Sequence, residues 1–192
     1  GLTKKQASPT SPRGLKSNTT PYGAALEALN PLTVSLGVAG ASFVAQAVDW
    51  IPEVLYEILH AAYRHRGFSL VRVLQRCPEF MPQAFEPWLR DPQRTLLLTH
   101  PNALQPSAGI AATYRNQRVH DPRDIDRARE IASLDDPIPV GILYRNPEAP
   151  VYEDLRHAGA PRSPEYIRAG FEQALDRFTV WPEDEARAQR AA

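Results

Sequence analysis

The sequence is poor in cysteine, methionine and lysine, with one, one and three of these residues among 192. A single cysteine excludes an internal disulfide framework and is typical of a reducing compartment, so we expect a cytoplasmic protein. The formal net charge is zero, which excludes a basic surface over the whole molecule, and we expect no nucleic-acid partner. The longest uncharged stretch, residues 28–48, is interrupted by Asn30, Pro31 and Gly40, so we expect no membrane partner and recognise no signal peptide.

The first 26 residues differ in composition from the rest of the chain. Proline and glycine recur through them, at Pro9, Pro12, Gly14 and Pro21. These residues exclude a continuous helix or a central strand, so the segment is predicted to be a long loop. All three lysines and one arginine lie here, at Lys4, Lys5, Arg13 and Lys16. Taken alone, the segment is a solvated basic loop or an arm that contacts phosphates. The choice of lysine in a chain that otherwise uses arginine favours a role for a compact ammonium group.

Residues 41–74 contain two apolar runs separated by the pattern of an amphipathic helix. The runs at 41–45 and 68–74 are predicted to be buried strands. The helix between them has an apolar face made of Val54, Leu55, Ile58, Leu59, Ala62 and Tyr63. We expect Asp49 to cap this helix and Gly67 to end it. The pattern predicts a right-handed βαβ unit with parallel strands.

Further elements are expected on both sides of this unit. Asn30 followed by Pro31 is typical of a helix start. Beyond the unit we expect a short helix near 83–89, a strand at 94–99, an irregular stretch at 101–122, a helix at 124–134, and a strand at 139–144. A last helix begins at Ser163, and its periodicity predicts a buried face of Ile167, Phe171, Leu175 and Phe178. A polar tail follows from residue 183.

Few side chains form a recognisable catalytic or metal-binding pattern. His60 and His65 lie five residues apart on one predicted helix, which does not bring two ligands together. His100, His120 and His157 lie in separate segments, and their spacing gives little support to a Cys/His nucleophile with Cys77. No phosphate-binding glycine-rich loop is present. Cys77 follows a predicted strand, where a lone cysteine is usually a small buried apolar residue.

Three stretches resemble the beta subunits of the 2-oxoacid:ferredoxin oxidoreductases, which are thiamine diphosphate enzymes. Residues 1–10, G-L-T-K-K-Q-A-S-P-T, resemble the family loop Y-G-L-T-K-G-Q-x-S-P-T. Residues 67–78 resemble the family segment that ends in Cys-Pro, and residues 139–145, P-V-G-I-L-Y-R, resemble a strand near its C-terminus. Two positions depart from the family. Lys5 replaces a glycine, so the identity of the substrate is not fixed by the resemblance. Gln46 replaces a common arginine. We expect the change at Gln46 to alter a contact with a partner subunit or with coenzyme A.

The resemblance implies a fold and a division of the chain. The fold would be α/β, part of a three-layer parallel-sheet thiamine diphosphate-binding fold followed by a small C-terminal α/β extension. Residues 1–80 would be the C-terminal part of the cofactor-binding domain, residues 81–182 the C-terminal region of the beta subunit, and residues 183–192 a polar tail. We expect this chain to be the C-terminal portion of such a subunit, with the residues that bind magnesium and the cofactor diphosphate preceding Gly1.

The resemblance also implies a reaction and its participants. The enzyme would decarboxylate a 2-oxoacid of the pyruvate or 2-oxoglutarate type oxidatively to an acyl-CoA, and pass electrons through a [4Fe–4S] cluster to ferredoxin. Lys4 would attract the substrate carboxylate, Leu2 would form a wall of the substrate pocket, and Cys77 would be the fourth cluster ligand. The other three cluster ligands are absent from this chain, which would be inactive alone. The partners would be an alpha or fused alpha–gamma subunit, ferredoxin, the 2-oxoacid and coenzyme A; the cofactors would be thiamine diphosphate, Mg²⁺ and the cluster.

Three alternatives stay open at this point. The chain could come from a thiamine diphosphate enzyme without an iron–sulfur cluster, in which Cys77 has no ligand role. It could be a non-catalytic interaction module whose basic N-terminal loop binds anionic partners. It could also be an unrelated α/β domain.

Overall fold

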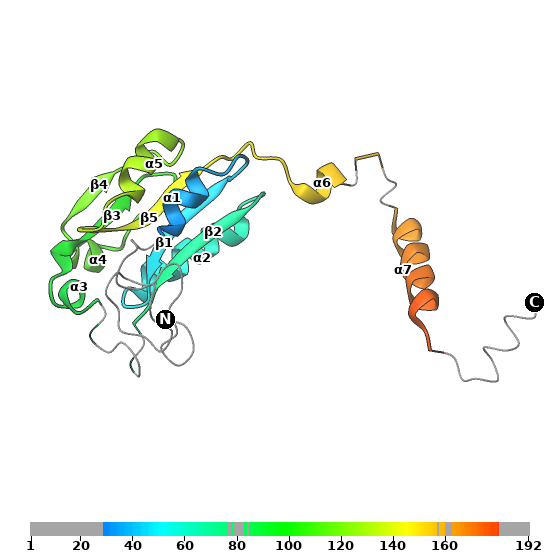
Figure 1. Cartoon of the computed structure of the whole chain (residues 1–192), viewed down its shortest axis with the longest axis horizontal. Helices are drawn as coiled ribbons and strands as arrows, with labels where there is room; N and C mark the ends of the chain where they lie inside the picture. Colours follow the sequence, from blue (N-terminus) through cyan, green and yellow to red (C-terminus); the bar gives the residue numbers. More distant parts are fainter. Residues whose placement is uncertain are drawn as a thin grey trace, which may run out of the picture. The chain divides into compact units, whose positions relative to one another are not determined.

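The chain divides into two compact units, Gly1–Val151 and Tyr152–Ala192. A computed structural model describes residues 29–76, 78, 83, 85–156, 158–159 and 163–180. The first unit contains a five-stranded sheet with helices, and the second contains two helices (Figure 1). The division that the sequence suggests, after residues 80 and 182, stays a prediction.

The elements follow one another as alternating strands and helices. The strands are β1 (Phe43–Val48), β2 (Ser69–Leu74), β3 (Thr95–Thr99), β4 (Gln117–Val119) and β5 (Ile138–Arg145). The helices of the first unit are α1 (Pro31–Leu36), α2 (Pro52–Arg64), α3 (Glu86–Arg90), the 3₁₀ turn η3 (Pro92–Arg94), α4 (Ala108–Thr113) and α5 (Ile125–Ala132). The second unit has α6 (Tyr152–Arg156) and α7 (Pro164–Phe178).

The sheet has the order β2-β1-β5-β3-β4 and is mostly parallel. β1 and β2 pair in parallel from Phe43–Ser69 to Val48–Leu74, with α2 as the crossover, which confirms the predicted βαβ unit. β3 pairs in parallel with both β4 and β5. β5 runs antiparallel to β1, so the sheet is mixed rather than wholly parallel. A buried apolar run can enter a sheet in either direction, and the sequence pattern therefore does not fix this pairing.

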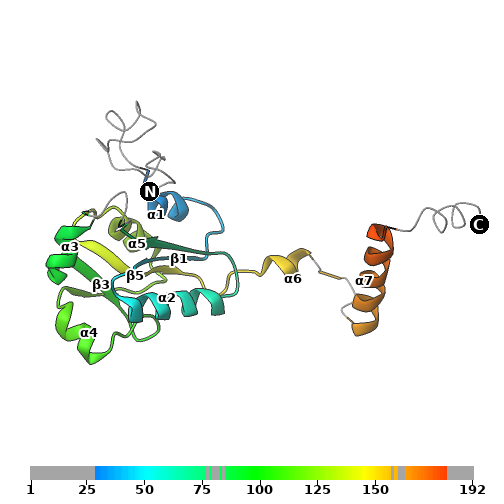
Figure 2. The same ribbon diagram turned by 90° about the horizontal axis from the view of Figure 1, so that it is seen from below.

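Helices cover both faces of the sheet and form the expected three layers (Figure 2). On one face, Val54 and Ile58 of α2 share a core with Ile110 of α4 and with Phe43 and Val140 of the sheet. The residues buried on the other face come from α1, α5 and the sheet: Leu32, Leu36, Val44, Leu96, Leu98, Ala128, Ile131, Ala132 and Leu143. The α/β class and layering agree with the sequence prediction.

Of two residues predicted to cap helices, one does so and the other does not. The Asn30 side chain caps α1, because its Oδ1 accepts the Leu32 N–H at 3.0 Å. Asp49 does not cap α2, which begins after Ile51 without a side-chain cap. The Asp49 backbone N–H instead donates to the Leu74 carbonyl at 3.1 Å, so this residue extends the pairing of β1 and β2.

The segment expected to be irregular, residues 101–122, contains α4 and the short strand β4. Both are at the lower end of element length, and a three-residue strand shows too little alternation to be recognised. These two elements matter for the site, because they separate β3 from β5 in the chain and place β4 at the edge of the sheet.

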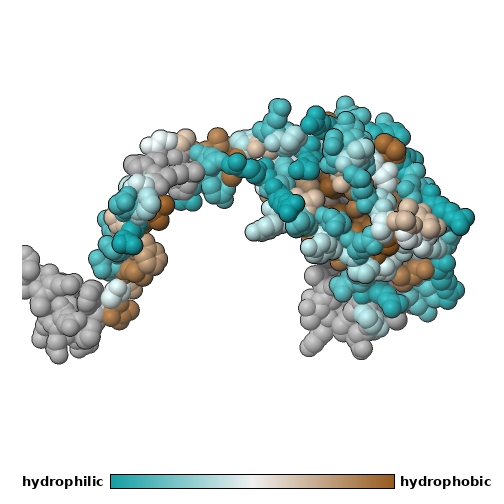
Figure 3. All heavy atoms as spheres, turned by 180° about the vertical axis from the view of Figure 1, so that it is seen from behind, coloured by the Kyte–Doolittle hydropathy of each residue, from teal (hydrophilic) through white to brown (hydrophobic). Residues whose placement is uncertain are grey.

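The predicted buried face of the last helix is exposed. Ile167, Phe171, Leu175 and Phe178 of α7 are 61%, 63%, 51% and 78% exposed. Figure 3 shows apolar side chains at the surface of this helix. The 3.6-residue period identified the helix correctly, but burial of its apolar face needs a surface to pack on. None of the helices that the structure describes has the length and apolar character of a membrane span.

Candidate functional site

The chain connections after β3 and β4 leave the sheet toward opposite faces. The connection after β3 leads to α4, which packs on the face covered by α2. The connection after β4 leads to α5, which packs on the face covered by α1. In an α/β sheet, ligands bind at the carboxyl ends of strands where neighbouring connections diverge in this way. A ligand site is therefore expected at the carboxyl ends of β3, β4 and β5.

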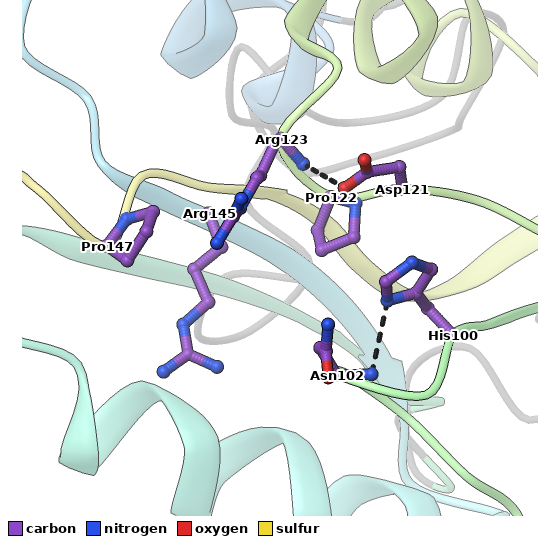
Figure 4. Close-up of a pocket in the computed structure, with 7 residues that line it drawn as sticks. All are labelled: His100, Asn102, Asp121, Pro122, Arg123, Arg145 and Pro147. Carbon is purple, nitrogen blue, oxygen red and sulfur yellow. Dashed lines mark hydrogen bonds between the residues drawn. The ribbon is translucent and has the colours of Figure 1, made fainter.

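A hollow of about 380 Å³ lies at that edge. Its lining comes from the residues that follow β3 and β4 and from the end of β5: His100, Asn102, Asp121, Pro122, Arg123, Arg145 and Pro147. Figure 4 shows His100 and Asn102 on one side and Arg123 and Arg145 on the other. The volume lies within the usual range of small-molecule sites, about 300–1,000 Å³.

Local hydrogen bonds fix the two loops that line the hollow. After β3, the His100 N–H donates to the Leu104 carbonyl at 3.1 Å, and the Asn102 N–H donates to His100 Nδ1 at 3.2 Å. Because Nδ1 accepts, the neutral His100 ring carries its proton on Nε2. After β4, the Asp121 carboxylate accepts the Arg123 N–H at 3.0 Å. Both loops are thus held in shape by their own side chains.

A second hollow, of about 400 Å³, adjoins the first and shares Arg145 with it. Helix α2 and the loop after β3 provide its walls. The polar residues that line it, besides Arg145, are Glu57, His60, Arg64 and Gln105. The Arg145 side chain points toward α2 (Figure 4).

Arg145 holds its position through its backbone and leaves its guanidinium group unpaired. It ends β5, and its N–H donates to the Pro122 carbonyl at 2.7 Å, which links β5 to the loop after β4. Its Nε is buried and has no hydrogen-bond partner. None of the ion pairs within the described part of the chain includes Arg64, Arg123 or Arg145. Three cationic side chains therefore face the two hollows without an acidic partner.

A buried histidine lies near Arg145 at the start of β1 and β2. His65 is 8% exposed, and its Nε2 lies 2.9 Å from Ser42 Oγ. The Ser42 hydroxyl donates its one proton to the Phe68 carbonyl at 3.0 Å, so His65 Nε2 is the donor of this pair. Burial first, and the charge of Arg145 second, lower the pKa of His65 below its ordinary value of 6.5. The imidazole is therefore neutral at pH 7.

The carboxyl ends of β1 and β2 lie at the opposite edge of the sheet, because β5 is antiparallel to β1. Aromatic rings gather there: Trp50 lies 5.4 Å from Phe85, and Phe85 lies 6.0 Å from Trp88, between ring centroids. Trp88 Nε1 donates to Asp136 at 3.2 Å, and Arg94 stacks over the Trp88 ring while pairing with the same carboxylate. Cys77 follows β2 in the sequence and lies outside the described residues, as do Leu2 and Lys4.

The other residues considered in the sequence do not form a catalytic group. His120 is buried, and its Nε2 lies 2.6 Å from the Leu143 carbonyl, a contact that joins β4 to β5. His100 lines the first hollow, His60 lines the second, and His157 lies outside the described residues. Where the structure is described, no three histidine, aspartate, glutamate or cysteine residues cluster as metal ligands would. A Cys/His nucleophile therefore gains no support.

Gln46 lies inside the sheet, and the expectation that the missing arginine alters a contact with a partner subunit or with coenzyme A stays a prediction. It is 2% exposed within β1, and its Nε2 donates to the Pro139 carbonyl of β5 at 2.7 Å. The amide therefore links the two antiparallel strands inside the sheet. An arginine here would need a different arrangement of these strands or of its own side chain.

The sequence reasoning missed Arg123 and Arg145 as site residues. One available signal was the position of Arg145, a charged residue directly after a buried strand, where ligand contacts often lie. The neighbourhood of Arg123 could not be found this way, because it depends on β4, a strand that the pattern did not reveal.

Comparisons with known proteins agree with one another. A family model for the C-terminal region of the pyruvate ferredoxin oxidoreductase beta subunit matches residues 111–159, a segment that includes Arg123 and Arg145. A 2-oxoacid:ferredoxin oxidoreductase subunit beta from Sulfolobus sp is 33% identical over 171 residues, which are 88% of this chain and 52% of the relative. The 2-oxoglutarate oxidoreductase subunit KorB of Mycobacterium tuberculosis is 45% identical over 86 residues, which are 45% of this chain and 23% of the relative.

A solved structure is similar to most of the chain. It is a 2-oxoglutarate:ferredoxin oxidoreductase from Magnetococcus marinus with 2-oxoglutarate, coenzyme A and succinyl-CoA bound. The TM-score is 0.59 at 26% sequence identity, and the match covers 86% of this chain and 52% of that chain. The chain spans about half the length of the curated relatives that it matches over most of its own sequence.

Proposed function

Because the chain belongs to the family of 2-oxoacid:ferredoxin oxidoreductase beta subunits, we propose that it acts as part of such a subunit. The reaction is the oxidative decarboxylation of a 2-oxoacid to an acyl-CoA, with electrons passed to ferredoxin. The observation that carries the proposal is the similarity to the Sulfolobus subunit along 88% of the chain. The loop motif of residues 1–10 supports it, because its lysine and hydroxyl residues suit a carboxylate substrate.

We assign three residues of this chain to the reaction. Lys4 attracts the carboxylate of the 2-oxoacid, and the second carboxylate where the substrate has one. Leu2 forms a wall of the pocket and limits the length of the substrate side chain. Cys77 provides one thiolate to a [4Fe–4S] cluster.

The chain alone does not fit the complete set of cofactors. A [4Fe–4S] cluster is held by four thiolates, and the sequence has one cysteine. The described residues contain no cluster of three candidate metal ligands that could bind Mg²⁺ for thiamine diphosphate. The iron–sulfur cluster therefore needs further thiolates from elsewhere in the complete enzyme.

The proposal implies partners and a location. The partners are an alpha or fused alpha–gamma subunit, ferredoxin, the 2-oxoacid and coenzyme A. A single cysteine suits a reducing compartment, and we place the enzyme in the cytoplasm.

The test is steady-state kinetics of the enzyme assembled with its alpha subunit. Reduction of ferredoxin should require both a 2-oxoacid, pyruvate or 2-oxoglutarate, and coenzyme A. Lys4→Ala should lower kcat/KM for the 2-oxoacid by about ten- to a hundredfold, since a charge-assisted hydrogen bond to the substrate is lost. Lys16→Ala removes the same charge from the same segment and should leave kcat/KM within about twofold.

A second variant tests the pocket wall. Leu2→Ala should change the order of preference among 2-oxoacids in favour of bulkier side chains, because it removes volume and no charge. Unchanged kcat/KM in Lys4→Ala for both acids would remove Lys4 from the site. Activity without an iron–sulfur cluster would support the alternative thiamine diphosphate enzyme, and no activity in the assembled complex would support the interaction module.

A further inference from the structure

The two hollows at the carboxyl ends of β3, β4 and β5 meet at Arg145, and nothing in the reaction assigned above uses them. Arg64 and Arg123 line one hollow each, and Arg145 lines both. We propose that this crevice binds a phosphate group, with Arg145 as the central contact. For free phosphate the proposal is independent of the oxidoreductase reaction, and for coenzyme A it rests on the function proposed above; the probes used below distinguish the two cases.

The unpaired guanidinium group of Arg145 is the first reason. Its Nε is buried without a partner, although most buried polar atoms in proteins have one. A guanidinium group presents its N–H groups in a planar fork that matches two oxygens of a phosphate. Because Nε is closed to solvent, an oxyanion in the hollow would contact the terminal Nη groups of this fork, which are not among the buried atoms.

The charge balance of the lining is the second reason. Arg64, Arg123 and Arg145 face the hollows, and the acidic residues of the lining are Glu57 and Asp121. The Asp121 carboxylate already accepts a backbone N–H from its own loop. A phosphate monoester carries a charge of about −1.5 to −2 at pH 7 and has three acceptor oxygens. It can therefore engage more than one guanidinium group, whereas a single carboxylate carries one negative charge.

The placement of the donors is the third reason. Arg145 ends a central strand, and its backbone is bonded to the loop that carries Arg123. His100 also lines the first hollow, and its Nδ1 accepts the Asn102 N–H, so Nε2 is the ring nitrogen left for a ligand. Donors on strand ends and hydrogen-bonded loops are held in place before the ligand arrives, which reduces the entropy cost of binding.

A phosphate group could come from free phosphate or from a larger molecule such as coenzyme A. The experiment uses the ¹⁵N-labelled 21.4-kDa chain and follows arginine Nε–H signals by NMR at constant ionic strength. Inorganic phosphate, coenzyme A and 2-oxoglutarate are titrated separately. We expect saturable shifts of the Arg145 Nε–H signal with phosphate or coenzyme A. The dissociation constant of that probe should be at least about tenfold lower than the dissociation constant of 2-oxoglutarate.

Two variants decide whether Arg145 makes the contact. Arg145→Lys keeps the charge and removes the fork, so it should weaken phosphate binding about tenfold. Arg118→Lys changes an arginine of β4 that lines neither hollow, so it should leave binding within about twofold. If Arg145→Lys does not fold, as judged by its amide spectrum, Arg123→Lys serves in its place with a smaller expected loss.

The probe that saturates the site identifies the kind of ligand. Saturation by inorganic phosphate supports a site for free phosphate, and saturation by coenzyme A alone supports a site for the phosphate of a larger molecule. Stronger binding of 2-oxoglutarate than of both phosphate probes would overturn the proposal in favour of a carboxylate site. Unchanged arginine signals with all three probes, or equal binding by Arg145→Lys, would also overturn it.

Discussion

At Gly141, β5 passes close to Leu98 of β3. The Gly141 φ of +145° is a backbone conformation that favours glycine, and an added Cβ would lie 2.7 Å from Leu98 Cβ and 3.0 Å from the Leu98 carbonyl oxygen. Gly141→Ala should therefore lower the free energy of unfolding by about 2 kcal/mol or more, from backbone strain and from the clash with β3. Urea denaturation followed by circular dichroism measures the change.

Gly109 provides a matched control. It lies in α4, and nothing lies within 4 Å of an added Cβ. Gly109→Ala should raise the free energy of unfolding by about 1 kcal/mol, because alanine is the better helix former. Equal and small effects of both substitutions would show that β3 and β5 are not packed as closely as the structure has them.

His65 gives stability a dependence on pH. Its folded-state pKa is below the ordinary 6.5, because burial and then Arg145 disfavour the charged ring. The unfolded chain thus takes up the proton at a higher pH than the folded chain does. The stability contributed by the neutral ring is complete above about pH 6.5 and is lost as the pH falls toward the lower folded pKa, with a slope of at most about 1.4 kcal/mol per pH unit.

His65→Gln tests this dependence, because glutamine keeps an N–H donor for Ser42 and does not titrate. The free energy of unfolding, measured by urea denaturation at several pH values below 7, should fall less steeply in the variant than in the parent chain. Carboxylates titrate in both proteins, so the difference between the two slopes isolates His65. Identical slopes would show that His65 titrates normally in the folded chain.

The sequence pattern predicted those helices and strands whose formation depends on residues close together in the chain. The βαβ unit from β1 to β2 was found because α2 has a regular apolar face between two buried runs. The antiparallel pairing of β5 with β1 was not, since neighbours in the sheet are chosen by packing between residues about a hundred positions apart. The apolar side chains of α7 are exposed for a related reason. The 3.6-residue period predicts that a helix has an apolar face, but it does not predict which surface packs on that face.

The helix α1 is held at its start by a single side chain. Asn30 caps it through Oδ1, and Asn30 Nδ2 donates to the Ala132 carbonyl at the end of α5, at 2.7 Å. Asn30→Ala should lower the free energy of unfolding by about 1–3 kcal/mol, because it removes both the cap and the link between the helices. Asn30→Ser keeps an acceptor for the cap, but the shorter serine side chain cannot donate to the Ala132 carbonyl. The free energy of unfolding should therefore fall by less, about 1 kcal/mol.

Thermal unfolding monitored at 222 nm gives both values, and the ranking of the two variants is the decisive result. Thr33→Ala is the control, since its hydroxyl donates to the Asn30 carbonyl on an exposed surface. An Asn30→Ser variant as unstable as Asn30→Ala would mean that the link to α5, rather than the cap, carries the effect.

At the scale of the whole molecule, the candidate site could be predicted only in part. Arg145 ends a strand that the sequence located, and the rule for carboxyl edges then points to it. Its neighbours His100 and Arg123 come from two other connections, and their meeting depends on the strand order β5-β3-β4. The carboxyl ends of β1 and β2 lie at the edge of the sheet opposite to Arg145, a separation set by the direction of β5.

The two cores predict how the chain responds to loss of its second unit. Among the described residues, the buried apolar side chains on both faces of the sheet come from the stretch between Leu32 and Leu143. Removing residues 152–192 should therefore leave the free energy of unfolding of the first unit within about 0.5 kcal/mol, since substitutions and deletions away from buried features have small effects. Urea denaturation of the shortened and full chains measures this, and the m-value reports any change in the surface exposed on unfolding.

The same truncation should reduce the binding of a hydrophobic dye, because α7 exposes Phe171 and Phe178 in the full chain. Phe171→Ser combined with Phe178→Ser is the matched control: it keeps the chain length and should lower the dye fluorescence to a similar degree without changing the urea midpoint. A large fall in both stability and m-value on truncation would show instead that the folding of residues 1–151 depends on the second unit. In that case the double variant should destabilise the protein as well.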